Sequence, residues 1–449
     1  MKKYLTCLIA VLLTLGVFAG CGGNAGGGEK IDPNRTQITV AMKNDPAEKL
    51  IMNAFKAAFE EENPDIQIIV ETTVGTDYVQ TVFNYAVSEF PDILWTSGDY
   101  HSTVSAAGKF EDLRPYYDRD IPDWQEKYHP ASMSTTKINA ADESIWFAPR
   151  DFNQLVVFYN KNAFEAAKQL DPSIKDPNDP SYYENGRTGW TWAEFKDTVK
   201  KFRALQLAGS KGEALTRNSV AVLGGFTWNV SSYTILRGFG GDVFDEEGNV
   251  VMDSANAMRA YNEMIEFVKN NYTTSKNAAF NNKLAAMEFG VRTNVISMEK
   301  LNFDVAPFPI MEVPVIGSGC SGYAMSASCE HKEEAWKFLK FIISREGQEI
   351  FGQTKASVPC LTELLYDEDA AWRKSTPDIN NDAFVARADD ALNLNFASEV
   401  APKNQSAVVQ EYNNFFFSLN NEKKYQTEEG LASLVSSYMK KIADAANAA

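Results

Sequence analysis

Strand-like and helix-like segments alternate at the start of the chain, and this alternation constrains the fold more than any other feature of the sequence. Residues 37–41 and 66–70 are apolar runs that are typical of buried strands. Between them, Asp45 and Glu48 form a capping-box pattern at the start of a helix expected over residues 46–62. A strand, a helix and a second strand in this order predict a βαβ unit, in which the two strands run parallel.

The alternation continues beyond this unit, so we predict an α/β fold. A further helix is expected from about Tyr78, and a short strand at 93–95 follows it. Later helices are predicted at 191–207, which starts with another capping-box pattern, and at 254–270. The chain has 449 residues, and because domains usually have about 100 to 200 residues, we expect two lobes.

The N-terminus has the layout of a secretory signal. Lys2 and Lys3 precede an apolar stretch at 8–19, which is shorter than the roughly 20 apolar residues that span a bilayer. Small residues before Cys21 resemble the lipobox of bacterial lipoproteins, so we predict a signal peptide at 1–20 and lipidation of Cys21. Residues 21–35 then form a glycine-rich tether. The alternative is an ordinary signal peptide with an incidental cysteine.

The charge balance excludes one class of partner. The chain has 43 Lys and Arg residues against 60 Asp and Glu residues, a formal net charge of −17. Nucleic-acid binding needs a basic surface, and no basic run follows the N-terminus, so we expect no nucleic-acid partner. An acidic protein is also repelled by anionic lipids, so the lipid itself would provide the anchor.

Cysteines and histidines do not form a recognisable framework. Apart from Cys7 in the signal peptide and the lipid site, the cysteines are Cys320, Cys329 and Cys360. This number is small and odd, so the fold rests on its core, with at most one disulfide, for which Cys320 and Cys329 are the candidates. The three histidines are far apart in the sequence, and we expect no metal site and no cofactor.

Several motifs, in their order and spacing, resemble those of extracellular solute-binding proteins of bacterial ABC importers, the family that includes maltose- and oligosaccharide-binding proteins. The resemblance covers most of residues 37–360. The matching segments are Pro91-Asp92-Ile93 with Trp95 and Asp99, residues 108–115, Trp146-Phe147-Ala148-Pro149, Phe158-Tyr159-Asn160-Lys161, residues 191–195, Gly240-Gly241, Ala285-Ala286-Met287, Ala306-Pro307-Phe308-Pro309 and residues 335–339.

This resemblance implies a periplasmic-binding-protein-like fold, with two α/β lobes joined by a hinge of crossing segments and a ligand cleft between the lobes. The N-terminal lobe would comprise residues 36–149 and 304–356. The C-terminal lobe would comprise 150–303 and 357–449, so the chain would cross near Pro149, Asp304 and Ser357. Closure of the hinge on the ligand would signal occupancy to the importer.

The resemblance also implies partners and a location. The permease subunits and the ATPase would be separate chains, because this chain has no nucleotide-binding motif. We expect a monomer that is lipid-anchored on the extracytoplasmic face of the cell membrane. The lipid site and the few cysteines favour a Gram-positive cell surface.

A sugar site combines aromatic rings with polar side chains, because sugars present both apolar CH faces and hydroxyls. On this basis and on the resemblance, we select as ligand-binding candidates Lys43, Asn44, Trp95, Asp99, Arg150, Asp151, Asn153, Trp228, Tyr233, Arg292, Gly319 and Trp372.

Most of these candidates have a structural alternative. Lys43 and Asn44 also fit a solvated loop, and Trp95, Tyr233 and Trp372 also fit a protein core. Arg150 and Asp151 also fit a salt bridge at the hinge. Trp228 is the best stacking candidate. Gly319 could let ligand approach the backbone, or could belong to a plain turn.

Two positions depart from the maltose-binding pattern, which weakens a maltose assignment. Asn153 lies where a maltose-type protein has an acid. Arg292 lies where sugar-binding relatives often carry a stacking tryptophan. Its guanidinium could bind hydroxyls or pair with a uronate carboxylate, or it could point outward from a loop.

Two other functions compete with a sugar receptor. A surface glycoside hydrolase would need two positioned carboxylates, but the sequence has no nucleophile elbow, metal-ligand motif or phosphate loop, so we expect no enzyme. A receptor for a polyamine, a peptide or a phosphodiester would keep the same fold. An oligosaccharide is favoured because aromatic residues are frequent near the expected cleft.

Overall fold

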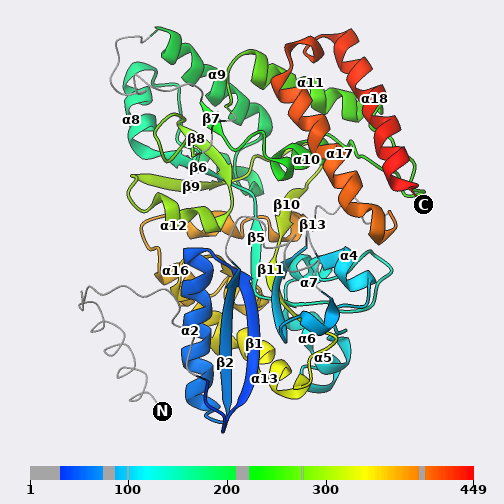
Figure 1. Ribbon diagram of the computed structural model, residues 1–449. Helices are drawn as coiled ribbons and strands as arrows, with labels where there is room; N and C mark the ends of the chain where they lie inside the picture. The colour runs from blue at the N-terminus through cyan, green and yellow to red at the C-terminus, as the bar shows by residue number, and fades with distance from the viewer. Residues whose placement is uncertain are drawn as a thin grey trace, which may run out of the picture.

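The computed structural model describes residues 31–73, 86–98, 101–208, 222–274, 276, 278–393 and 400–448. The chain forms two α/β lobes, one above the other in Figure 1, with strands passing between them. We call the lobe that contains the N-terminal sheet the N-lobe and the other the C-lobe. The predicted signal peptide, the lipid site at Cys21, Asp99 and the helix expected from Tyr78 lie outside the described residues.

The N-lobe is built on a five-stranded sheet in the order β2-β1-β3-β11-β4. The parallel strands β1, β2 and β3 confirm the predicted βαβ unit. β11 lies between β3 and β4 and is antiparallel to both, although it comes from a much later part of the chain. The strand bounds are Thr36–Lys43 for β1, Ile66–Thr73 for β2, Ile93–Ser97 for β3, Ala148–Pro149 for β4 and Ser321–Met325 for β11.

Helix α2 (Pro46–Glu62) follows the prediction from its first residue to its last. Its N-cap is Asp45, whose Oδ1 accepts hydrogen bonds from the backbone N–H groups of Ala47 at 2.8 Å and Glu48 at 3.2 Å. Its apolar stripe packs on helices that come much later in the chain, with the rings of Phe59 and Phe338 4.9 Å apart. The N-lobe therefore closes only after the chain has returned from the C-lobe.

The remaining N-lobe helices are short, apart from the pair that covers α2. They are α4 (His101–Ala106), α5 (Arg114–Asp120), α6 (Trp124–Lys127), α7 (Pro130–Thr135), α13 (Lys332–Ile342), α14 (Arg345–Gln353), α15 (Thr362–Leu365) and α16 (Ala371–Lys374).

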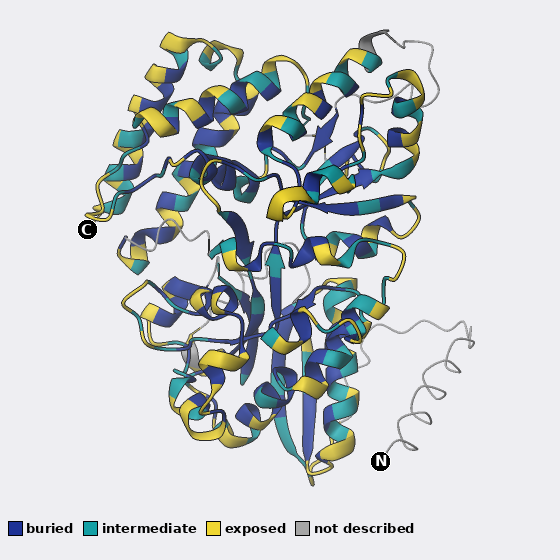
Figure 2. Ribbon diagram, turned by 180° about the vertical axis from the view of Figure 1, so that it is seen from behind, coloured by how far each residue is buried: buried dark blue, intermediate teal, exposed yellow. Residues whose placement is uncertain are grey.

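The C-lobe has a four-stranded sheet in the order β7-β8-β6-β9, with β6 antiparallel to both of its neighbours. The predicted helices α9 (Trp192–Ala208) and α11 (Ala255–Lys269) are confirmed. The other elements are β6 (Val156–Asn160), β7 (Leu223–Gly224), β8 (Met287–Gly290), β9 (Phe303–Pro307), α8 (Lys161–Leu170), α10 (Asn229–Gly238), α12 (Val295–Met298), α17 (Pro402–Asn421) and α18 (Glu428–Ala446). Figure 2 shows buried residues along the strands of both lobes and exposed residues on the outer helices.

Four short strands, in the order β12-β5-β10-β13, form a hinge sheet between the lobes. β5 continues directly from β4 and β10 runs directly into β11, so these two chain segments cross side by side. The strand bounds are Asp151–Gln154 for β5, Ile316–Gly319 for β10, Val358–Pro359 for β12 and Ala391–Asn393 for β13.

Two predicted crossings lie elsewhere. β9 contains Asp304, which pairs with Tyr159 of β6, so the chain is still in the C-lobe there and returns only at 319–321. After β12 the chain stays on the N-lobe, because the backbone N–H of Ala371 donates to Glu349 of α14 at 2.7 Å. It reaches the C-lobe at Asn380, whose N–H donates to Asp304 at 2.6 Å. The chain therefore crosses at residues 375–380 and not at Ser357.

The three cysteines within the described part of the chain, Cys320, Cys329 and Cys360, are buried free thiols, so the suggested disulfide between the first two is absent. Burial raises the pKa of each thiol above its ordinary value. None of the helices in the described ranges is long and apolar enough to cross a membrane.

His101 makes the stability of the N-lobe dependent on pH. Its ring is buried edge-on against Phe147, with the centroids 5.2 Å apart, and burial lowers its pKa to about 4. A histidine in the unfolded chain has a pKa near 6.5. Between these values the unfolded chain binds a proton that folded His101 does not bind, so this contribution to stability is lost as the pH falls from 6.5 towards 4.

We expect His101→Gln to remove this loss, which amounts to about 2–3 kcal/mol at pH 4.5. Urea unfolding of the wild type and the variant at pH 7.5 and 4.5 measures the difference. An equal loss of stability in both proteins would show that the His101 ring titrates normally in the folded state.

Candidate ligand-binding site

The carboxyl ends of the parallel strands in both lobes lie next to the hinge. In the N-lobe, Ser97 at the end of β3 pairs with Ser321, the residue at which the second crossing enters the sheet. In the C-lobe, Gly290 at the end of β8 pairs with Val156, which directly follows the hinge strand β5. Open α/β sheets bind ligands outside the carboxyl ends of their strands. The loops that face a ligand in this fold are therefore those that follow β1, β3, β7 and β8.

The loop after β1 brings two candidates to this edge. The Lys43 ammonium lies 3.7 Å from the centroid of the Trp95 ring, and Asn44 beside it is exposed. Trp95 itself is only 3% exposed and packs in the N-lobe core. Trp95 could stack on a sugar or pack in the core. Core packing fits the structure, because Lys43 covers the face of its ring.

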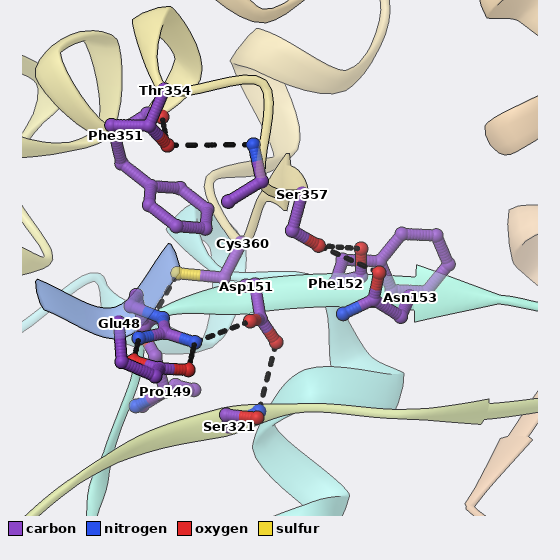
Figure 3. Close-up of polar contacts among 12 residues, drawn as sticks. Glu48, Pro149, Asp151, Phe152, Asn153, Ser321, Phe351, Thr354, Ser357 and Cys360 are labelled. Carbon is purple, nitrogen blue, oxygen red and sulfur yellow. Dashed lines mark hydrogen bonds and ion pairs between the residues drawn. The ribbon is translucent and has the colours of Figure 1, made fainter. Parts of the chain in front are cut away.

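Arg150 and Asp151 form a buried ion cluster at the first crossing (Figure 3). The Arg150 Nη1 lies 2.5 Å from Glu48 Oε2, its Nη2 lies 3.0 Å from Glu48 Oε1, and its Nη1 also donates to the Tyr323 hydroxyl at 3.2 Å. Asp151 lies 3.4 Å from Arg150 Nη2 and accepts the backbone N–H of Ser321 at 2.8 Å. The cluster thus joins α2 to both neighbouring crossing strands.

Burial raises the pKa of Asp151 to about 6, although the Arg150 guanidinium opposes this shift. Two carboxylates share one guanidinium here, so Arg150 and Asp151 fit the alternative interpretation of a salt bridge at the hinge. The sequence analysis did not identify Glu48 as part of this ion cluster, because its position in the first turn of α2 indicated only a role in capping the helix. The observed Asp45 cap leaves the Glu48 carboxylate to pair with Arg150.

Asn153 and Gly319 lie opposite each other in the hinge sheet, on β5 and β10. The Asn153 Oδ1 accepts the Ser357 hydroxyl at 2.6 Å, which ties β5 to the segment before β12. A Cβ atom placed on Gly319 would have no neighbour within 4 Å among the described residues, whereas one on Gly322 would lie 2.0 Å from the Ala148 carbonyl oxygen. There is open space beside Gly319, on the strand that joins the lobes.

We therefore expect Gly319→Ala to change the free energy of unfolding by less than about 0.5 kcal/mol. Gly322→Ala, three residues further on, is expected to cost about 1–3 kcal/mol, because the new methyl group meets backbone atoms. Chemical denaturation of the two variants tests this pair. Equal destabilisation would mean that the space beside Gly319 is filled.

Trp228 is the exposed aromatic residue at the carboxyl edge of the C-lobe. It directly precedes α10, and 40% of its surface is exposed. The turn before it requires Gly225, which has φ +71° and would place a Cβ 2.1 Å from the Phe289 carbonyl oxygen. Tyr233, one helical turn later, is buried, and its hydroxyl donates to Asp242 at 2.8 Å. It fits core packing, the alternative interpretation.

Arg292 and Trp372 contact each other instead of a common ligand. Trp372 is completely buried, and its indole Nε1 donates to the Leu364 carbonyl at 2.7 Å. The Arg292 guanidinium is 1% exposed and lies 4.9 Å from the centroid of the Trp372 ring. Because both side chains are buried, neither is placed to contact a ligand. The burial of Arg292 also argues against the alternative interpretation, in which its side chain points outward from a loop.

The described residues contain no group of histidine, cysteine or carboxylate side chains that could hold a metal ion. Among the candidates in the described residues, Asn44 is exposed, Lys43 is half-buried and Trp228 is 40% exposed, while Gly319 has no described atom within 4 Å of an added Cβ.

The comparisons with known proteins agree with this arrangement. The sequence model of the bacterial extracellular solute-binding proteins matches residues 44–349. A comparison with curated proteins gives no match. Among solved structures, an ABC substrate-binding protein from Listeria monocytogenes in complex with cycloalternan is similar, with a TM-score of 0.72 and 18% identity over 91% of this chain and 99% of that one.

Two further structures show the same fold. The GacH receptor of Streptomyces glaucescens, solved unliganded and with acarbose, has a TM-score of 0.69 and 18% identity over 91% of this chain and 99% of that one. A solute-binding protein of an ABC transporter from Thermotoga lettingae, bound with α-D-tagatose, has a TM-score of 0.69 and 16% identity over 91% of this chain and all of that one.

Two α/β lobes, paired crossing strands and strand ends that face the hinge define a two-lobed binding protein of the periplasmic-binding-protein type. The sequence model of one family within that class matches more than half of the length of this chain. The chain belongs to the bacterial extracellular solute-binding proteins. This family consists of binding proteins, so the chain is a solute-binding protein and not an enzyme.

Proposed function

We propose that this protein is the lipid-anchored receptor of an ABC transporter that captures a sugar, specifically an oligosaccharide, and delivers it to the membrane permease. One observation carries the choice of cargo. An exposed tryptophan, Trp228, stands at the strand ends of the C-lobe, while Lys43 and Asn44 stand at those of the N-lobe. Relatives with this fold were solved with cycloalternan, acarbose and tagatose, which supports the same class of cargo here.

In this proposal the ligand contacts both lobes at once. Trp228 offers an apolar face for the CH groups of a sugar ring, and Lys43 and Asn44 offer groups that hydrogen-bond hydroxyls. The open space beside Gly319 lets a ring lie against the crossing strand. A ligand that bridges the lobes favours their closed arrangement, because only that arrangement allows all contacts together.

The anchor and the partners rest on the sequence. We propose that Cys21 is lipidated after removal of residues 1–20 and that the protein acts as a monomer on a Gram-positive cell surface. Separate permease and ATPase chains would complete the transporter. Mass spectrometry of the protein from its native membrane tests the anchor, since a lipidated Cys21 gives a diagnostic N-terminal peptide.

A thermal-shift screen of the mature protein without lipid tests the cargo. The panel contains mono- and oligosaccharides, with uronates, polyamines, peptides and phosphodiesters as the competing classes. A ligand that binds only the folded state raises the melting temperature by mass action. A rise with sugars and no turnover supports the proposal, whereas a rise with another class alone keeps the receptor and replaces the sugar.

Trp228→Ala is expected to weaken binding of the sugar found in that screen by roughly 1–3 kcal/mol, about 5- to 150-fold. The loss has a direct cause, because the variant removes the aromatic face on which a sugar ring stacks. Isothermal titration calorimetry measures the change. Tyr366→Ala is the matched control, because Tyr366 is also an exposed aromatic residue (55%) but lies away from the strand ends. The affinity of this variant for the sugar should equal that of the wild type. Unchanged affinity of the Trp228 variant would remove Trp228 from the site.

A further inference from the structure

Arg292 is a buried cation that has no carboxylate partner among the residues that the structure describes. Its guanidinium donates to the Trp372 carbonyl at 2.5 Å, to Asn381 Oδ1 at 2.9 Å and to Thr376 Oγ1 at 3.0 Å. The Ser375 hydroxyl lies at 3.4 Å. All of these acceptors are neutral. Burial and the neighbouring Arg373 lower the pKa of Arg292 to about 9, which reflects the cost of this environment.

The acceptors of Arg292 all lie at or beside the crossing at residues 375–380. Arg292 itself belongs to the C-lobe, two residues after the end of β8. Trp372 belongs to α16 (Ala371–Lys374), which rests on the N-lobe: a Cβ atom on Gly352 of α14 would lie 2.7 Å from the Trp372 backbone nitrogen. Figure 1 shows α16 between α12 of the C-lobe and α2 of the N-lobe.

The crossing at residues 375–380 differs from the crossings through β5 and β10 in what holds it. The crossings through β5 and β10 pair with each other as strands. Residues 375–380 are in no strand, and the Arg292 side chain spans them by binding Trp372 before the crossing and Asn381 after it. The planar guanidinium suits this task, because its donors point in several fixed directions at once.

The arginine does more here than fill space. A buried acceptor that loses its donor costs free energy, and Arg292 is the donor to several neutral acceptors at once. The site already has apolar walls, since the guanidinium also lies 5.0 Å from the Phe384 ring centroid. A methionine would fit among these rings but could not bind the Trp372 carbonyl, Thr376 and Asn381 together.

We propose that Arg292 is the clamp of this crossing: by holding both ends of residues 375–380 it fixes the position of the C-lobe relative to α16 and the N-lobe. Loss of the clamp releases the lobes to sample a wider range of relative positions. This role concerns the ligand-free protein and is independent of the identity of the cargo.

Distances between the lobes test the clamp. Nitroxide labels at Glu61→Cys on α2 and Lys269→Cys on α11, both exposed sites, report the distance in ligand-free protein by double electron-electron resonance. The mature chain carries Cys21→Ser, and its other cysteines are buried. A sample without the two added cysteines measures any labelling of these native thiols.

We expect Arg292→Met to broaden the distance distribution and to move its maximum by several ångström, while circular dichroism shows a folded protein. Lys374→Met is the matched control. Lys374 is also a cation of α16, but it pairs with Asp369 at 2.8 Å, on the same side of the crossing. Its distribution should match that of the wild type.

Two outcomes overturn the clamp. An unchanged distribution in Arg292→Met would show that the crossing does not need Arg292 to hold it. Equal broadening in Lys374→Met would show that general damage to α16 is the cause. If circular dichroism shows that Arg292→Met does not fold, Arg292→Lys keeps the charge but cannot bind Trp372, Thr376 and Asn381 together, and the same comparison decides.

Discussion

Arg150→Met is expected to lower the free energy of unfolding by about 3–5 kcal/mol, because it leaves buried carboxylates without their counter-ion. Arg150 is 3% exposed and Asp151 1% exposed, so water cannot replace the guanidinium. Glu48 loses both of its contacts with the Arg150 side chain at the same time. Urea unfolding at pH 7.5 measures the loss. Arg119→Met is the control, because Arg119 pairs with carboxylates at the surface and should cost less than about 1 kcal/mol.

The pH dependence of this loss separates charge from packing. The pKa of Asp151 is already raised by burial, and removal of the guanidinium raises it further. At pH 5 the carboxyl group of the variant is therefore protonated and neutral, and the loss should be smaller than at pH 7.5. Adding Asp151→Asn to Arg150→Met should recover part of the stability at pH 7.5. An equal loss at both pH values would mean that packing, not charge, is responsible.

The local elements of this fold could be predicted from the sequence because their signals are local. The Asp45 cap begins α2, and the capping box at Thr191 is present, with Glu194 Oε2 accepting the Thr191 N–H at 2.7 Å. The parallel strands β1 and β2 follow from the helix between them. In each of these cases the deciding contacts lie within a few residues, or within one supersecondary unit.

The crossings expected near Asp304 and Ser357 could not be placed from the sequence because their positions depend on distant pairings. Residues 303–307 form an apolar strand that fits either lobe by pattern, and only pairing with β6, more than a hundred residues earlier, puts it in the C-lobe. The segment after β12 poses the same problem. Its helices stay on the N-lobe because of contacts such as that between Ala371 and Glu349.

The candidate site shows the same limit for single side chains. The strands at this edge were predicted, but β1, β2 and β3 each run two or three residues further than expected, so Lys43 is the last residue of β1 and Asn44 follows it. Whether a large side chain at such an edge points to a ligand or to the core depends on what packs around it. Arg292 follows β8 at the ligand edge, yet its guanidinium turns inward to Trp372, and no short sequence pattern specifies that direction.

Trp372→Ala is expected to lower the free energy of unfolding by about 3–5 kcal/mol, the typical cost of removing a completely buried tryptophan. The indole fills the space between two guanidiniums, with the Arg292 Cζ 4.9 Å and the Arg373 Cζ 4.5 Å from its ring centroid. The variant also removes the partner of the Leu364 carbonyl. The surrounding helices are tied to α14, so they cannot collapse fully into the cavity.

Trp228→Ala provides the contrast, because the same substitution at a residue that is 40% exposed should change the free energy of unfolding by less than about 1 kcal/mol. Denaturation curves and sugar titrations of both variants separate the two roles. Trp372→Ala should lose stability and, where it remains folded, keep most of the direct ligand contacts. Trp228→Ala should keep stability and lose affinity. The opposite pattern would place Trp372 in the binding site and Trp228 in the core. It would contradict the complete burial of Trp372 and the exposure of Trp228.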